Sequence, residues 1–267
     1  MKPRAPQQIL DSDFYGLNIQ RLLLANNSIS ELRPLSFWGL GNSLETLDLS
    51  YNKLRKVPNE ALKLLIKLKT LVLTGNAIQS IGPHELGFMK SLEVLTLDKN
   101  PITSIHPSFI SGSNNLNLLS LDAIKLDKKL ESVAAINANN VKGLSLTRNH
   151  LTFLPPRWGV NFTLLTLLNL GHNRLGDVIK MEDCFVGMEK SLKNLDLHSN
   201  HFLKNSKRYE HLPCRLHTFS SDSLEGVEAT VGTDGSGPEP QQDQEGEEEV
   251  TEGSAGARQS RPQPQQD

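Results

Sequence analysis

The sequence predicts an α/β protein: a curved solenoid with a parallel sheet on its concave side, followed by a disordered C-terminal tail. Three observations predict this fold class. One spacing of leucines recurs through most of the chain, an asparagine holds the same place in nearly every copy, and the composition changes near residue 220. Only 5% of the residues are aromatic, so aliphatic side chains must form most of the core.

Residues 1–18 form a partial first coil in this interpretation. Two apolar positions that follow the strand in later coils are matched here, the first by Ile9 or Leu10 and the second by Phe14, but no strand precedes them. Terminal coils of a solenoid need a cover, so we expect either a fragment of a longer protein or a chain whose first residues act as a cap. The opening stretch MKPRAPQQILDSDFYG has no apolar segment and is not a signal peptide.

Eight copies of the spacing L-x-x-L-x-L-x-x-N-x-L follow. Their first residues are Ile19, Leu44, Leu68, Leu92, Leu116, Val141, Leu165 and Leu192, separated by 24 to 27 residues. In each copy L-x-L predicts a short strand whose leucines point to one face and whose other residues point to the opposite face. Each coil buries its leucines only by stacking on the next coil.

The asparagine of each copy is predicted to bond to the backbone at the sharp turn after the strand. There the chain leaves N–H and C=O groups without sheet partners, and an amide side chain supplies both donors and an acceptor. The predicted asparagine ladder consists of Asn27, Asn52, Asn76, Asn100, Asn149, Asn173 and Asn200. Ile124 holds this position in the fifth coil and interrupts the ladder.

The second half of each coil carries an I-x-x-L-P type pattern. Prolines fix φ where the convex turn begins; they are Pro34, Pro58, Pro83, Pro107 and Pro155. Further apolar residues are predicted to close the core from the convex side. These are Phe37, Leu62, Leu86 and Phe109 or Ile110.

With this unit the chain resembles the leucine-rich repeat family in its typical 24-residue form, as in chaoptin-like, Slit-like and Toll-like ectodomains. The stretch GNSLETLDLSYNKLRKVPNEALKLLIKLKTLVLTGN is most similar to chaoptin-like adhesion proteins. The resemblance implies a non-catalytic protein-binding module for extracellular or cell-surface recognition and adhesion. The alternative is a cytosolic scaffold for a signalling partner, favoured by the absence of a signal peptide; a third hypothesis is the repeat portion of an enzyme.

The solenoid is predicted to span residues 19–219, with an irregular turn after Asn200, and the tail to span 220–267. From Ser223 onward the chain has eleven acidic and two basic residues, a net charge of −9. The whole chain carries −2, so residues 1–222 carry +7. The tail has almost no aliphatic residues and cannot form a core.

The predicted binding site is the concave face, where a protein ligand is expected and a nucleic acid is not. Eight strands at about 4.8 Å spacing span roughly 34 Å, and the exposed residues on them carry mixed charges. Aromatic and arginine side chains contribute most to protein interfaces. The residues predicted to contact the ligand are Asp48, Tyr51, Asp98, Lys99, Arg148 and His172.

No cofactor, metal site or catalytic motif is predicted. His172, His198 and His201 lie in adjacent coils near Asp196, but the last should turn away from the others, which disfavours zinc. The chain has two cysteines, Cys184 and Cys214. The sequence allows two alternatives for them, one disulfide bond or two buried free thiols.

Two glycosylation sequons begin at Asn26 and Asn161 and favour secretion weakly. No apolar run of about 18 residues exists, so insertion into a membrane is not expected.

Overall fold

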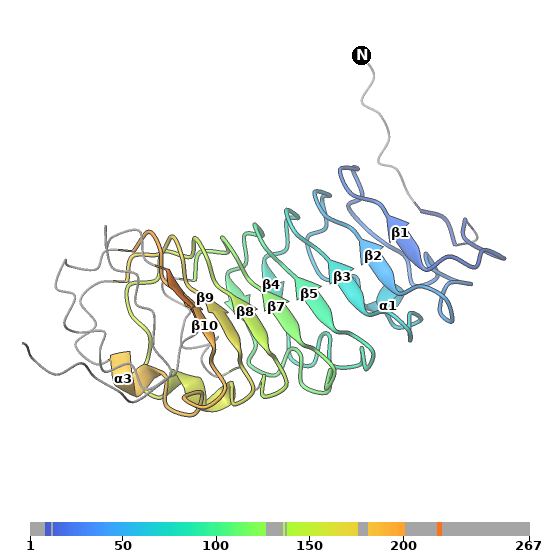
Figure 1. Cartoon of the computed structure of the whole chain (residues 1–267). Coiled ribbons are helices and arrows are strands. Elements are labelled where there is room, and N and C mark those ends of the chain that lie inside the picture. The colour runs from blue at the N-terminus through green and yellow to red at the C-terminus, as the bar shows by residue number, and fades with distance from the viewer. Residues whose placement is uncertain are drawn as a thin grey trace, which may run out of the picture. The chain divides into compact units, whose positions relative to one another are not determined.

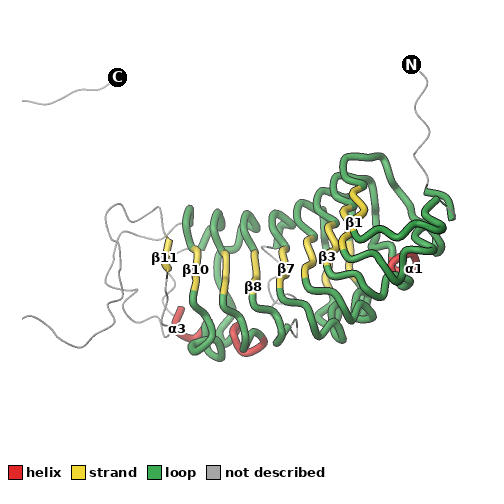
Figure 2. Tube along the Cα trace, turned by 45° about the vertical axis from the view of Figure 1, so that its right-hand side comes forward, coloured by secondary structure: helices red, strands yellow, loops and turns green. Residues whose placement is uncertain are grey.

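The computed structural model describes residues 9–11, 13–126, 136, 138–175, 181–200 and 218–220, all within one unit that spans residues 1–231. Nine parallel strands form one sheet in the order β1-β2-β3-β5-β7-β8-β9-β10-β11. Their bounds are β1 Arg21–Leu23, β2 Thr46–Asp48, β3 Thr70–Val72, β5 Val94–Thr96, β7 Leu118–Ser120, β8 Gly143–Ser145, β9 Leu167–Asn169, β10 Asn194–Asp196 and β11 Thr218–Ser220. Figures 1 and 2 show these strands in a row along one side of a curved stack of coils.

The first eight of these strands lie where the leucine spacing predicts them. Thr46 pairs with Thr70, and Thr70 pairs with Val94, so the stretches beginning at 44, 68 and 92 are neighbours in one parallel sheet. The predicted solenoid with a parallel concave sheet is therefore confirmed.

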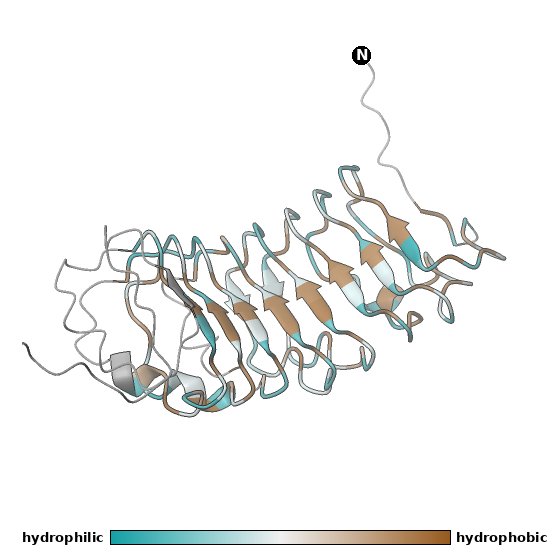
Figure 3. Cartoon of the chain, viewed as in Figure 1, coloured by the Kyte–Doolittle hydropathy of each residue, from teal (hydrophilic) through white to brown (hydrophobic). Residues whose placement is uncertain are grey.

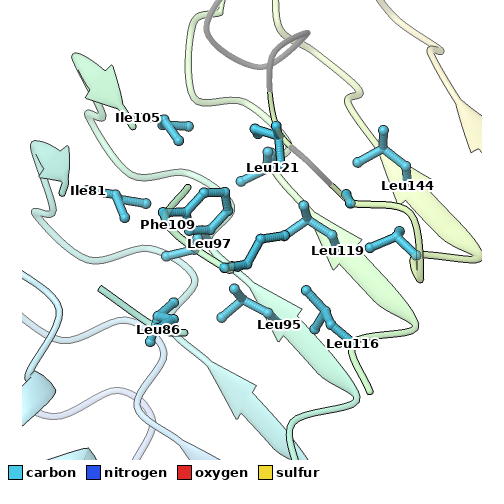
Figure 4. Packing of buried hydrophobic residues seen from close by; sticks show 14 of the residues in the cluster. Ile81, Leu86, Leu95, Leu97, Ile105, Phe109, Leu116, Leu119, Leu121 and Leu144 are labelled. Carbon is cyan, nitrogen blue, oxygen red and sulfur yellow. The ribbon is translucent and has the colours of Figure 1, made fainter. Parts of the chain in front are cut away.

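The core lies between the sheet and the convex side. The central leucine of each internal strand points into it, and Leu47, Leu71 and Leu95 are all 0% exposed. Burying a leucine stabilises the fold by about 1.5–3 kcal/mol. In Figure 4, Leu95 and Leu97 of one coil lie beside Leu119 and Leu121 of the next, so each coil completes the core of its neighbour.

The convex side contains short, varied elements. They are α1 (Asn59–Leu62), the two-stranded sheet of β4 (Ser80–Ile81) and β6 (Ser104–Ile105), the 3₁₀ helix η1 (Trp158–Asn161) and α3 (Met181–Cys184). The predicted closing residues are buried, since Phe37, Leu86 and Phe109 are 0% exposed and Leu62 is 1% exposed. At the first coil, the rings of Phe14 and Phe37 stack with centroids 6.2 Å apart.

The strand β11 was not predicted. It pairs in parallel with β10, Phe219 opposite Leu195, inside the segment that the sequence analysis assigned to an irregular turn and the start of the tail. The pattern there keeps Leu216-x-x-Phe219 but has Ser221 at the third apolar position and Leu224 at the asparagine position. The spacing rule fails for this coil because two of its four key residues are replaced. The tail predicted after it lies outside the described residues, and the proposed division at 18 and 219 stays a prediction.

In the part of the chain that the structure describes, no helix combines the length and the apolar character needed to span a bilayer.

Candidate functional site

The concave face is formed by the strand residues that alternate with the buried leucines. Thr46 and Asp48 lie on it, half-buried, on either side of the buried Leu47. The paired register aligns the first residues of successive strands in one row across the sheet. This row consists of Arg21, Thr46, Thr70, Val94, Leu118, Gly143, Leu167 and Asn194.

The ladder amides connect neighbouring coils behind this face. Asn76 Nδ2 donates to Leu49 O at 2.9 Å in the preceding coil and to Leu73 O at 3.0 Å in its own coil. Its Oδ1 accepts from Leu54 N at 3.0 Å. The same bridge to the preceding coil is made by Asn52, Asn100, Asn149, Asn173 and Asn200.

Two ladder positions differ from this arrangement. Asn27 is half-buried and donates only to Leu24 O and Ala25 O of its own coil. Ile124 is 0% exposed and brings no side-chain amide, although its N–H still donates to Asn149 Oδ1 at 2.9 Å.

The residue before each ladder position adopts a left-handed backbone conformation in all eight coils. The φ values are Asn26 57°, Tyr51 52°, Gly75 70°, Lys99 54°, Ala123 54°, Arg148 56°, His172 53° and Ser199 53°. Four of the six predicted contact residues, Tyr51, Lys99, Arg148 and His172, occupy this row, and all four are exposed. Because this conformation is costly for residues with a Cβ, its repetition indicates that the turn geometry imposes it.

Tyr51 and Lys99 meet across the coil between them. The Lys99 ammonium lies 3.1 Å from the Tyr51 hydroxyl and 5.6 Å from the centre of its ring. The intervening residue is Gly75, and a Cβ there would lie 2.6 Å from Tyr51 Cδ1. The tyrosine ring therefore lies over a position that only glycine leaves open.

The acidic residues of the face hold the backbone of adjacent coils. Asp98 Oδ1 accepts from Ser120 Oγ at 2.7 Å and from Asp122 N at 2.9 Å. Burial raises the pKa of Asp98, and these hydrogen bonds oppose the rise. Asp48 instead accepts from Ser50 N of its own coil at 2.8 Å.

The structure brings together two of the three histidines that were considered as metal ligands. The rings of His172 and His198 meet edge to face with centroids 4.4 Å apart, and His198 Nδ1 lies 2.6 Å from Asp196 Oδ1. His201 lies outside the described residues. Among the residues that are described, no three histidine, cysteine or acidic side chains form a group that could hold a metal ion.

Three leucines that the repeat pattern places on this face were not among the predicted contact residues. Leu23 is 68% exposed, Leu118 is 42% exposed and Leu167 is 46% exposed. Leu118 and Leu167 stand on either side of Gly143 in the paired register. Figure 3 shows the hydrophobic residues of these strands in brown. The signal was a leucine at an outward-facing strand position, the third residue of β1 and the first residue of β7 and β9, which has no role in the buried pattern.

The two sequon asparagines occupy different environments. Asn26 is exposed and belongs to the same left-handed row as Tyr51 of the next coil. Asn161 ends η1 and is half-buried. Cys184 is buried, and its thiol donates to Leu154 O at 3.2 Å; Cys214 lies outside the described residues.

The repeat matches a known family profile. The sequence profile described as "Leucine rich repeat" matches residues 17–78, 42–102, 66–126 and 139–202, which together are more than half of the chain. The chain belongs to the leucine-rich repeat family. A comparison with curated protein sequences gave no significant match.

Solved structures of other leucine-rich repeat proteins have the same fold. Internalin C2 of Listeria monocytogenes is 22% identical with a TM-score of 0.52, and the alignment covers 76% of this chain and 80% of that one. Human 5T4, also called trophoblast glycoprotein or Wnt-activated inhibitory factor 1, is 23% identical with a TM-score of 0.59, covering 74% and 75%. A leucine-rich repeat protein of Leptospira interrogans is 26% identical with a TM-score of 0.56, covering 74% of this chain but 50% of that one. The first two likenesses concern the fold alone.

Proposed function

We propose that this leucine-rich repeat chain is a non-catalytic module that binds a protein ligand on its concave face. The observation that carries the proposal is the combination of exposed apolar and polar side chains on one rigid sheet. Leu118 and Leu167 are 42% and 46% exposed there, and the Tyr51 and Lys99 side chains are already in contact. Exposed aromatic and aliphatic residues within a polar surround are typical of protein interfaces.

The size of the face supports this function. Eight strands at about 4.8 Å spacing extend over roughly 34 Å, and a standard protein interface covers about 800 Å² per partner. The side chains are held by a backbone that neighbouring coils fix through the asparagine amides. Such a surface loses little conformational entropy when it binds.

A capture experiment with matched variants tests this proposal. The full chain is used as bait for displayed cell-surface and secreted proteins, in parallel with the double variant Leu118→Asp/Leu167→Asp. The control is Ile66→Asp, because Ile66 is 62% exposed and precedes β3 outside the sheet. A ligand retained by wild type and by the control but lost by the double variant supports the concave face. A ligand retained equally by all three shows that the concave face is not the binding surface.

We further propose that the module acts outside the cell or at its surface, in recognition or adhesion. The supporting observations are the typical 24-residue repeat and the exposed sequon asparagine Asn26. A glycosidase should then increase the gel mobility of the protein expressed in animal cells behind a secretion leader, and Asn26→Gln or Asn161→Gln should reduce this change. Protein that stays unmodified at both positions favours the second candidate, a cytosolic scaffold for a signalling partner.

A further inference from the structure

We propose that six basic residues along one edge of the concave face form a subsite for an acidic polypeptide segment of the ligand, a proposal that rests on the function proposed above. We call these residues the basic rim. They are Lys99, Lys125, Arg148, His150, His172 and Arg174. All six are exposed.

The rim is continuous because its members occupy equivalent places in successive coils. Each stands immediately before or after a ladder position, where the chain leaves the strand. Backbone bonds join these turns: Arg174 N donates to Leu151 O, next to His150, at 2.8 Å. Arg148 N donates to Gly171 O, next to His172, at 3.2 Å. In Figure 3 the turns beyond the strand arrowheads carry much of the hydrophilic teal.

The turn at the fifth coil belongs to the same run. Ile124 N donates to Asn149 Oδ1 at 2.9 Å, which places Lys125 beside the turn that carries Arg148 and His150. Lys99 N donates to Asp122 O at 2.8 Å, next to Ala123 of the fifth coil. Neighbouring coils are about 4.8 Å apart, so charges in adjacent coils can contact one extended ligand.

No rim residue forms an ion pair with another described residue, although Asp98 is close enough to Lys99 for their charges to interact. The ion pairs in the described part of the chain are Lys63–Glu60, Lys69–Glu45 and His198–Asp196, and none includes a rim residue. Asp98 directly precedes Lys99, and Asp122 lies three residues before Lys125. Their Oδ1 atoms accept hydrogen bonds from Ser120 Oγ and Ser145 Oγ at 2.7 Å.

The charge is also confined to one part of the solenoid. In the first three coils the residues before and after the ladder positions are Asn26, Ser28, Tyr51, Lys53, Gly75 and Ala77. These positions carry one basic residue, whereas the same positions of the next four coils carry six, with Pro101 and Ala123 as the neutral members. If every coil carried these basic residues, the repeat alone would explain them. Because only some coils carry them, the repeat does not explain them.

A polypeptide fits this edge better than a nucleic acid or a sulfated polysaccharide. Asp98 and Asp122 place carboxylates beside the rim, and these would repel a polymer with a negative charge on every unit. Leu118 and Leu167 lie at the other end of the same strands and offer apolar contacts. A peptide can combine spaced carboxylates with apolar side chains and N–H donors. These groups can contact the basic rim, the exposed leucines and the aspartate carboxylates, respectively.

The test uses a fluorescein-labelled peptide of alternating glutamate and serine, with a glutamine-for-glutamate version as the neutral probe. Fluorescence anisotropy at about 50 mM salt measures binding to the full chain, because screening weakens such contacts at higher ionic strength. The rim variant is Arg148→Glu/Arg174→Glu. The matched control is Lys142→Glu/Lys193→Glu, which makes the same change in net charge at the exposed opposite edge, before β8 and β10. Thermal denaturation checks that both variants fold.

We expect the rim variant to bind the glutamate peptide about tenfold more weakly and the control to differ from wild type by less than about twofold, a contrast of about 1.4 kcal/mol. The titration is repeated with Glu245, Glu247, Glu248 and Glu249 changed to glutamine, because these acids of the same chain would compete with the probe. The proposal is overturned if both double variants bind the glutamate peptide equally more weakly than wild type. It is also overturned if the peptide binds neither the natural chain nor the chain with the four glutamine changes.

Two further outcomes separate this proposal from its alternatives. Tighter binding of heparin or single-stranded DNA than of the peptide, lost in the rim variant, would show that the rim takes a phosphate or sulfate polymer. A captured protein ligand that is lost with Leu118→Asp/Leu167→Asp but kept by the rim variant would leave the concave-face function standing and remove the rim from it.

Discussion

The Tyr51 hydroxyl accepts a hydrogen bond from the Lys99 ammonium at 3.1 Å, although 48 residues separate the two in sequence. They occupy the same left-handed position in coils two apart, and Gly75 is the equivalent residue of the coil between them. The contact exists because glycine at that position leaves space for the tyrosine ring.

Changing Gly75 to alanine should therefore displace the ring. The added Cβ would lie 2.6 Å from Tyr51 Cδ1 and 2.8 Å from Cε1, and alanine is disfavoured at φ +70°. We expect Gly75→Ala to lower the free energy of unfolding by about 1 kcal/mol, measured by urea denaturation. The matched control is Ala123→Gly, at φ 54° in the same row. Glycine adopts this conformation without strain, so the control should leave the free energy of unfolding unchanged or raise it by up to about 1 kcal/mol. A loss of stability in the control would show that the left-handed row carries no strain.

Asn76→Ala should be strongly destabilising. It removes a buried amide that bridges two coils through Leu49 O, Leu73 O and Leu54 N. A buried polar group left without a partner costs about 1–3 kcal/mol, so we expect a loss of about 2–4 kcal/mol in the free energy of unfolding. Chemical denaturation monitored by circular dichroism measures it.

The control for this experiment is Asn27→Ala. Asn27 is half-buried and bonds only within its own coil, at 3.0 and 3.1 Å, so its loss should cost less than about 1 kcal/mol. If the two variants lose the same stability, the bridge between coils is not what stabilises the solenoid.

The sequence predicts the eight repeat strands well because their signal is repeated: Leu47, Leu71 and Leu95 are buried by the same spacing. It does not predict β11, where Ser221 and Leu224 replace the expected leucine and asparagine. The candidate contacts were chosen by residue type, and nothing in one coil shows that Tyr51 crosses to Lys99 over Gly75. Such contacts depend on which side chains the stacking brings together. A spacing rule describes the residues common to all coils and carries no information about those that differ.

Asp98→Asn should stabilise the protein at neutral pH. Burial raises the pKa of Asp98, and the charge of Asp122 adds to the rise. A carboxyl whose pKa is higher in the folded state opposes folding once it is ionised, so the wild type loses stability as pH rises through the unfolded and then the folded pKa. Asparagine keeps the Oδ1 acceptor for Ser120 and Asp122 N–H but has no charge.

We expect a gain of less than about 1 kcal/mol at pH 7, since the side chain is partly exposed to solvent. The gain should vanish at a pH below about 3, where both forms are neutral. Urea denaturation at the two pH values measures the difference. Asp48→Asn is the control, because Asp48 Oδ1 also accepts a backbone hydrogen bond, from Ser50 N at 2.8 Å, and Asp48 is not among the charges that act on Asp98. A gain for Asp98→Asn that persists at low pH would show that its cause is not the charge.

Cys184 should be unreactive in the folded protein. Burial raises the pKa of its thiol to about 11, with a smaller contribution from the charge of Asp183. Because the thiolate is the reactive species, we expect iodoacetamide to modify Cys184 at pH 8 only after denaturation, measured by mass spectrometry in a Cys214→Ser variant. The raised pKa also makes the stability depend on pH. The folded state holds the thiol proton more tightly than the unfolded state does. The resulting contribution to stability is present below the ordinary thiol pKa and is lost as pH rises towards about 11. Replacing Cys184 with alanine in the same background should remove this part of the alkaline loss. Rapid modification of the native protein at pH 8 would mean that the thiol leaves its contact with Leu154 O far more often than global unfolding allows.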